Sequence, residues 1–223
     1  MRCIVEVPSA QKQMALQNRV TPFGNLIAIA DRGTLMGNRG VLHDEHKTIV
    51  RNRGPRRDWV TCSLSFKGCK QTIMRPKSYT QLFFLDEAVA FAAGHRPCST
   101  CRREEFVAFK QAWTSAGLAD SDQRLLVTKV DPMMAADRID RHDRKVTYRA
   151  AMHELPAGAM IARDAEPDVA WLLWKNQFWR WSPAGYSDPR GVTDEVVTVL
   201  TPRCSVRVLS SGYGLKVHES ACG

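Results

Sequence analysis

The stretch AAGHRPCSTCRREEF, residues 92–106, holds the feature around which this sequence is organised. A run of small residues ends at Gly94, and Pro97 prevents the preceding helix from continuing. Cys98 and Cys101 follow with two residues between them, and a charged segment with helical periodicity begins directly afterwards. Cysteines at this spacing form a metal-binding knuckle, a redox pair, or two ordinary buried thiols.

The sequence on both sides of the two cysteines predicts regular structure. Asp86 is a good N-cap for a helix over residues 87–93, which Gly94 is placed to end. Residues 102–117 predict a second helix, because aromatic side chains recur in it at helical spacing. Residues 60–66 alternate apolar and polar side chains, as a half-buried strand does.

Four of the seven cysteines lie between positions 62 and 101. Tetrahedral zinc takes four soft ligands at about 2.3 Å, and thiolates are such ligands. We therefore predict one Zn²⁺ ion bound by Cys62, Cys69, Cys98 and Cys101. The gap between the first two is wider than in most zinc modules, so His95 or His43 is an alternative fourth ligand. A redox pair would leave the first two cysteines unexplained, and inert thiols would not favour turns rich in Pro, Ser and Thr.

Length and composition restrict the class of protein. The 223 residues suffice for one large domain or two small ones. No apolar run reaches the roughly 18 residues of a membrane-spanning helix, so we expect no membrane association. The odd number of cysteines and the lack of an export signal lead us to expect a cytoplasmic protein with reduced thiols.

The net charge of +9 is unevenly distributed along the chain. Residues 1–117 contain 18 Lys and Arg against 9 Asp and Glu, whereas residues 118–223 contain 14 of each. A positive excess confined to one half indicates a polyanionic partner for that half, and we predict nucleic acid, with DNA as the expected form. A solubilising surface is the alternative explanation.

The predicted contacts to nucleic acid come from the basic loop RNRGPRR, residues 51–57, and from cations near the cysteines. Arginine forks match the geometry of phosphate oxygens, and cations also help to keep thiolates deprotonated. The predicted nucleic-acid-binding residues are Arg51, Arg53, Arg56, Arg57, Lys67, Lys70, Arg96, Arg102 and Arg103. A loop that is only solvated is the alternative for residues 51–57.

The second half reads differently from the first. Residues 137–148 predict a charged, exposed helix, and from Leu155 onward the pattern is that of strands, including two in residues 197–214. Residues 170–181 predict a hairpin that turns at Lys175 and Asn176, and its four tryptophans are expected to form a core. We therefore predict an α+β fold, with a basic, zinc-centred part over residues 1–117 and a helical connector followed by a β-rich domain over residues 118–223.

The segment FFLDEAVAFAAGHRPCSTC, residues 83–101, resembles the zinc-binding module of Ada-type DNA alkylation-repair proteins, and the resemblance extends over residues 58–103. It implies short helices around a zinc ion. In that family the first cysteine of the module is both a zinc ligand and a methyl acceptor, and the matching position is Cys62. The whole chain, with GTLMGNRG and LTPRCSVRVLSSGY, is also similar to a group of bacterial proteins without an assigned activity.

We therefore expect a zinc-binding, nucleic-acid-binding protein related to DNA repair or processing, in which zinc is mainly structural. One alternative is an enzyme acting on DNA, either by alkyl transfer to Cys62 or as a nuclease. Another is a non-catalytic, zinc-stabilised protein-interaction module. The nuclease alternative would draw on acids and histidines in residues 137–154, which we interpret more simply as a solvated helix face.

Overall fold

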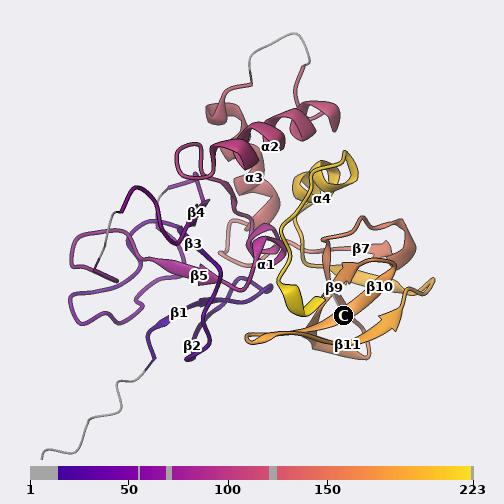
Figure 1. Ribbon diagram of the computed structural model, residues 1–223, viewed down its shortest axis with the longest axis horizontal. Coiled ribbons are helices and arrows are strands. Elements are labelled where there is room, and N and C mark those ends of the chain that lie inside the picture. The colour runs from indigo at the N-terminus through magenta and orange to yellow at the C-terminus, as the bar shows by residue number, and fades with distance from the viewer. Residues whose placement is uncertain (1–14, 55, 69–71, 121–124, 222–223) are drawn as a thin grey trace, which may run out of the picture.

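The computed structural model describes residues 15–54, 56–68, 72–120 and 125–221, which form two β-sheets and four α-helices. The predicted α+β class is therefore confirmed. The two sheets lie at opposite sides of the molecule, and the short helix α1 (Glu87–Ala92) lies between them (Figure 1).

The first sheet contains six strands in the order β2-β1-β5-β3-β4-β6. Their bounds are β1 Gln17–Val20, β2 Leu26–Ala28, β3 Leu35–Asn38, β4 Val60–Ser63, β5 Leu82–Phe84 and β6 Arg96–Pro97. Strands β4 and β6 run parallel, and Thr61 pairs with Pro97. Cys62 and Cys98 are the next residues along these two strands. The register of the pair therefore places the first predicted ligand beside the knuckle.

The second sheet contains six strands in the order β11-β10-β9-β8-β12-β7, with every neighbouring pair antiparallel. Its elements are β7 Tyr148–Ala151, the 3₁₀ helix η1 Met152–Glu154, β8 Met160–Arg163, β9 Glu166–Trp174, β10 Gln177–Ser182, β11 Gly185–Gly191 and β12 Val196–Val199. The predicted hairpin is confirmed, because Lys175 and Asn176 join β9 to β10 with φ of 52° and 60°. Two positive φ angles match the right-handed twist of the paired strands.

The other three α-helices lie in the upper part of the view in Figure 1, and a 3₁₀ helix ends the described chain. They are α2 Arg103–Ser115, α3 Val127–Arg138, α4 Arg203–Ser210 and the 3₁₀ helix η2 Glu219–Ala221. The predicted second helix corresponds to α2, which buries Phe109 and Trp113 as expected.

Two predictions about the second half are wrong. The helix expected over residues 137–148 ends at Arg138, because the Asp140 carboxylate accepts hydrogen bonds from the backbone N–H groups of His142 and Arg144 and closes a turn. The strand expected around residues 203–210 is α4. Cys204, Ser205, Val208 and Leu209 are its buried residues, and this i, i+4 spacing forms a helix face.

Helix α1 is buried along its whole length and belongs to a core that both sheets share. That core contains Phe84 and Val89 from the first part of the chain, and Leu172 and Trp179 from the second sheet. Trp171 is buried in a further cluster, so these tryptophans serve as core residues. The predicted division after residue 117 stays a prediction about how the chain is organised.

Two adjacent carboxylates at the start of α1 join distant segments. The first, Asp86, is the predicted N-cap and accepts a hydrogen bond of 3.0 Å from the Val89 N–H. Its other oxygen accepts from the Tyr186 hydroxyl of β11 at 2.9 Å and from the His218 N–H at 3.0 Å. Burial raises the pKa of Asp86, and the backbone hydrogen bonds oppose that effect.

The second carboxylate, Glu87, is completely buried. It accepts hydrogen bonds from the Arg102 guanidinium at 2.7 Å and from the Tyr213 hydroxyl at 2.8 Å on one oxygen. Its other oxygen accepts from the Lys216 N–H at 3.1 Å. The helix, the residue after the knuckle and the C-terminal segment therefore meet at one side chain.

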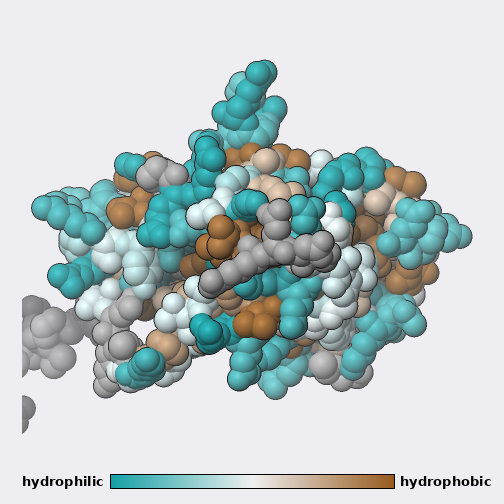
Figure 2. All heavy atoms as spheres, turned by 90° about the horizontal axis from the view of Figure 1, so that it is seen from above, coloured by the Kyte–Doolittle hydropathy of each residue, from teal (hydrophilic) through white to brown (hydrophobic). Residues whose placement is uncertain are grey.

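Hydrophilic side chains cover most of the face shown in Figure 2, where apolar side chains form separate patches. None of the described helices is long and apolar enough to cross a lipid bilayer.

The ion pair between Glu87 and Arg102 yields a first test. We expect Arg102→Met to lower the free energy of unfolding by about 3–5 kcal/mol, because it leaves a buried carboxylate without its cation. Arg103→Met is the matched control, since Arg103 is exposed and follows directly in the sequence, and its effect should stay within about 0.5 kcal/mol. Urea titration of the full chain measures both values, and equal losses would contradict the role given to Arg102.

Candidate metal centre

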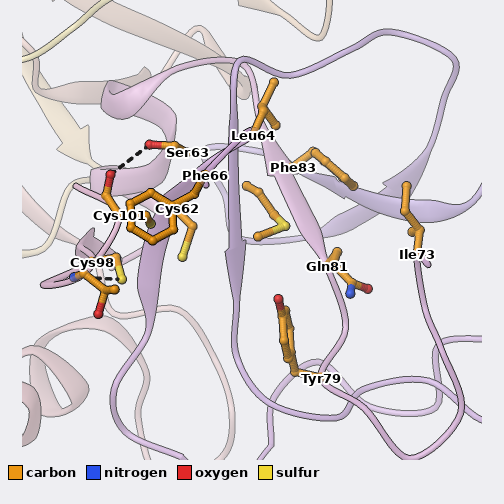
Figure 3. Close-up of a pocket in the computed structure, with 12 residues that line it drawn as sticks. Cys62, Ser63, Leu64, Phe66, Ile73, Tyr79, Gln81, Phe83, Cys98 and Cys101 are labelled. Carbon is orange, nitrogen blue, oxygen red and sulfur yellow. Dashed lines mark hydrogen bonds between the residues drawn. The ribbon is translucent and has the colours of Figure 1, made fainter. Parts of the chain in front are cut away.

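Three of the four predicted zinc ligands lie together. The Sγ atoms of Cys62, Cys98 and Cys101 are all within 4.8 Å of one another (Figure 3). Sulfur atoms around a tetrahedral zinc ion at 2.3 Å are about 3.8 Å apart, and this separation lies within the 4.8 Å limit. The fourth predicted ligand, Cys69, lies outside the described residues. The group could therefore hold a metal ion through three thiolates.

The knuckle is held to β4 by backbone hydrogen bonds. The Cys98 N–H donates to the Thr61 carbonyl at 2.9 Å, which extends the β4–β6 pairing by one residue. The Thr100 N–H donates to Cys98 Sγ at 3.4 Å, and an N–H donor favours the charged form of a sulfur. On the other side, the Ser63 hydroxyl donates to the Cys101 carbonyl at 3.1 Å. Strand and knuckle are thus fixed relative to each other without a metal.

The residues that precede the knuckle are fixed by α3. Gly94 has a φ of +78°, which favours glycine, and a Cβ atom there would lie 2.5 Å from Cδ of Arg138. Arg96 forms two hydrogen bonds, of 2.7 and 2.8 Å, with the Asp131 carboxylate of α3. Gly94 and Arg96 are therefore fixed by packing against α3 as well as by their place in the turn into the cysteines.

The three thiols affect one another's ionisation. A hydrogen bond from Cys62 lowers the pKa of Cys98 to about 4, although burial opposes this. The same hydrogen bond, together with burial, raises the pKa of Cys62. Burial also raises the pKa of Cys101. One thiolate is therefore favoured in the group, and binding a metal ion would have to displace protons from the other thiols.

The two histidines that we considered as alternative ligands are engaged elsewhere. Both ring nitrogens of His43 form hydrogen bonds, one of them to the Thr80 hydroxyl at 2.6 Å. His95 is fully buried, and its ring packs 5.2 Å from that of Trp59 and 4.7 Å from that of Phe84. Among the residues that the structure describes, neither histidine joins the cysteine group.

A pocket of about 390 Å³ opens beside the cysteines, and sequence reasoning missed it. Its lining residues are Met36, Cys62, Ser63, Leu64, Phe66, Ile73, Tyr79, Gln81, Phe83, Cys98, Thr100 and Cys101. Most of the side chains opposite the sulfurs are apolar (Figure 3). Their spacing along three strands and a loop gives no pattern from which the pocket could be predicted.

The four arginines of the basic loop are exposed, as a role in binding phosphates requires. Two of them have carboxylate partners: Arg53 pairs with Asp143, and Arg56 pairs with Asp58 at 2.5 Å. Exposed pairs of this kind contribute only about 0–1 kcal/mol, so a phosphate can replace the carboxylate at small cost.

The cations near the cysteines divide into two groups. Arg96 and Arg102 are 4% and 3% exposed and form the internal ion pairs described above. Their predicted contacts to nucleic acid are wrong, because a buried guanidinium with a carboxylate partner cannot reach a phosphate. Arg103 and Lys67 are exposed, the latter 5.4 Å from the Phe66 ring, and Lys70 lies outside the described residues.

The acids considered for a nuclease have structural partners. Asp137 accepts a hydrogen bond of 2.7 Å from the Cys204 N–H at the start of α4, while Asp140 closes its turn and Asp143 pairs with Arg53. Within the described ranges, the three cysteines are the only group of three or more possible metal ligands that lies together.

Comparison with known proteins adds no relative. No protein-family model, no curated protein and no solved structure matches this chain. The resemblance to the Ada-type module therefore stays a prediction, and the metal centre has to be interpreted from its own geometry.

Proposed function

We propose that this protein binds one zinc ion and nucleic acid, with DNA as the expected form, and that it acts in DNA repair or processing. Cys62, Cys98 and Cys101 supply three ligands, and Cys69 supplies the fourth. The observation that carries the proposal is the triangle of three sulfurs within 4.8 Å. A redox pair needs two thiols, so the third sulfur favours a metal.

The role of the metal in this proposal is mainly structural. The three described ligands come from β4 and from the turn between β6 and α2, so an ion bound to them would tie the edge of the first sheet to the start of α2. Four thiolates leave no coordination position for a substrate. Hydrogen bonds of Arg102 and the pairing of β4 with β6 hold the backbone around the cysteines in place. This supports a site with one fixed coordination geometry.

Nucleic-acid binding is supported by positively charged side chains that are exposed at the surface of the first half. Residues 1–117 carry 18 basic residues against 9 acidic ones, and the arginines of the loop at residues 51–57 are exposed. Arg51 and Arg57 have no ion-pair partner among the described residues. Such side chains contribute to affinity by releasing counterions from the phosphate backbone.

The metal proposal is tested by elemental analysis of the full chain, purified under reducing conditions. We expect one equivalent of zinc, and we expect Cys98→Ser and Cys101→Ser each to lose it, because a thiolate ligand disappears. Removal of zinc by a chelator should lower the melting temperature, since the energy of metal binding contributes to folding.

Cys204→Ser is the matched control for the metal test. Cys204 is a buried thiol in α4, outside the cysteine group, and its substitution should leave the zinc content unchanged. Zinc well below one equivalent in the native protein, or full zinc in Cys98→Ser, would refute the proposed centre.

The nucleic-acid proposal is tested by the salt dependence of DNA binding. Replacing Arg51 and Arg57 with Gln should weaken binding and reduce the slope of log affinity against log salt by roughly 0.9 for each phosphate that the variant no longer neutralises. Replacing Arg180 and Arg190 of the second sheet is the control, because both already pair with Glu166. Fluorescence anisotropy measures both slopes, and equal effects of the two double variants would rule out a binding surface at the basic loop.

A second candidate function is favoured by the position of Cys62. This residue is partly exposed and lines the 390 Å³ pocket, so a ligand in the pocket can reach its sulfur. In alkyl transfer from a DNA methylphosphotriester, Cys62 Sγ would form a bond to the methyl carbon. The bond between that carbon and the phosphate oxygen would break, and the oxygen would keep the electron pair as a phosphodiester anion.

Alkyl transfer predicts a gain of one methyl mass in the full chain after incubation with DNA that carries methylphosphotriesters. Cys62→Ser should abolish the gain, and Cys204→Ser, the buried control thiol, should keep it. Intact-mass spectrometry measures the product. An unchanged mass of the zinc-loaded protein would leave Cys62 as a ligand alone.

A further inference from the structure

A second pocket, of about 180 Å³, is lined by cations and shares no lining residue with the pocket at the cysteines. Arg39, Arg138 and Lys145 belong to its walls, together with Asn25, Asn52 and a fourth cation, Arg144, which pairs with Asp140. Asn52 is part of the basic loop, so the pocket opens next to the exposed arginines.

Arg39 is the most unusual residue of this pocket. Its side chain is completely buried at the end of β3, where the residue is 2% exposed. Its Nη1 donates to the Gly24 carbonyl at 2.9 Å, and its guanidinium carbon lies 4.4 Å from the centre of the Trp59 ring. Its Nε and Nη2 have no hydrogen-bond acceptor. A buried guanidinium with two unsatisfied donors is costly for a folded protein, and a ligand or an ordered water in the pocket would relieve that cost.

The other two cations come from the segment after Asp137. Arg138, at the end of α3, donates to the carbonyls of Gly94 at 3.2 Å and Arg57 at 2.6 Å, and its guanidinium carbon lies 4.0 Å from the centre of the Trp59 ring. Lys145 follows the turn closed by Asp140, and its Nζ donates to the Ala92 carbonyl at 2.5 Å. These contacts hold both side chains at the pocket wall. All three acceptors are backbone carbonyls, so they do not neutralise the positive charges.

In the described part of the chain, no ion pair balances the positive charge of Arg39, Arg138 and Lys145, although Asp131 attracts Arg138 electrostatically. Among the residues that the structure describes, no carboxylate forms an ion pair with Arg39, Arg138 or Lys145, and the acid in the pocket wall, Asp143, pairs with Arg53. Burial, followed by the charge of Arg39, lowers the pKa of Lys145 to about 7. Burial and the charge of Arg138 lower the pKa of Arg39 to about 9. A lowered pKa is what we expect for buried cations that lie close together without a counterion.

We propose that this pocket binds a phosphate group. Three cations without a carboxylate partner around one small cavity match a dianion better than a carboxylate, and arginine forks are suited to phosphate oxygens. The volume is below the roughly 300–1,000 Å³ of pockets for drug-sized ligands, so a single phosphate enters rather than a whole nucleotide.

The phosphate could be free in solution or could be the terminal phosphate of a nucleic acid that lies on the basic loop. Both sources present the same chemistry to the pocket. The proposal does not rest on the zinc centre or on nucleic-acid binding, because its main test uses inorganic phosphate. Its failure is therefore distinguishable from the failure of the proposed function.

The test is a series of thermal melts of the full chain as purified, in rising concentrations of inorganic phosphate, with chloride keeping the ionic strength constant. The melting temperature of the native protein should rise with phosphate, because a ligand of the folded state stabilises it by mass action. Lys145→Met should be at least as stable as the native protein without phosphate, since it removes an unbalanced charge, and should respond less to phosphate. The order of the two melting temperatures should therefore reverse as phosphate is added.

Lys110→Met is the matched control, because Lys110 is a partly buried lysine on α2 outside the pocket. It should keep the native phosphate response. Phosphorus NMR line broadening measures binding directly and does not depend on the stability of a variant. Absence of phosphate binding to the native protein, or the same binding in Lys145→Met, would overturn the proposal.

Two oligonucleotides then identify the source of the phosphate, one with a 5′-phosphate and one with a 5′-hydroxyl. Tighter binding of the phosphorylated strand, with the difference lost in Lys145→Met, assigns the pocket to a nucleic-acid end. Equal binding of both strands, with inorganic phosphate still bound, assigns it to free phosphate. Either result supports the phosphate site, which the melting and NMR experiments refute if the native protein does not bind phosphate or if Lys145→Met binds it equally well.

Discussion

The fold depends on the burial of two neighbouring carboxylates, Asp86 and Glu87, at the start of α1. Taking a charge out of water costs several kcal/mol, which only a complete set of donors offsets. Here the donors come from β11, from the residue after the knuckle and from the C-terminal segment. The two sheets share one core because α1 cannot be buried between them unless each segment supplies its hydrogen bonds.

The hydrogen bonds around Glu87 also fix the positions of the candidate metal ligands. Arg102 donates to Glu87 and also, at 2.8 Å, to the Thr61 hydroxyl. One side chain thus connects the buried helix, the strand before Cys62 and the residue after Cys101. The sulfurs are brought together by backbone register and by this guanidinium, so a metal ion would find its ligands already assembled.

Much of the first half could be predicted because its signals are local. The cap at Asp86 predicts where α1 begins, and the spacing of aromatic residues predicts α2. The clustering of cysteines in the sequence was enough to predict that Cys62, Cys98 and Cys101 lie together. Burial of Arg96 and Arg102 could not be predicted, because their partners Asp131 and Glu87 lie far away in the sequence. A basic residue beside a cysteine looks the same in a sequence whether it faces solvent or a buried acid.

The second half was harder for the same physical reason. Residues 137–148 have the charge pattern of an exposed helix, yet Arg138 and Lys145 line a pocket whose other walls come largely from the first half. The segment of α4 contains β-branched residues that favour a strand, but its buried face has helical spacing. In both places tertiary packing outweighs the local preference for secondary structure. The pocket beside the cysteines could not be predicted either, because no short stretch of sequence indicates it.

The hydrogen bonds of α1 also set an order of events during synthesis. Tyr213 and Lys216 reach Glu87 across 126 and 129 residues of chain, and His218 reaches Asp86 across 132. When α1 leaves the ribosome, these donors have not yet been made, and at the usual rate of about 5–20 residues per second they follow several seconds later. During that interval the two acids are best kept in water. Until the C-terminal segment arrives, Arg102 is therefore available to Glu87, but the donors from Tyr213, Lys216 and His218 are missing.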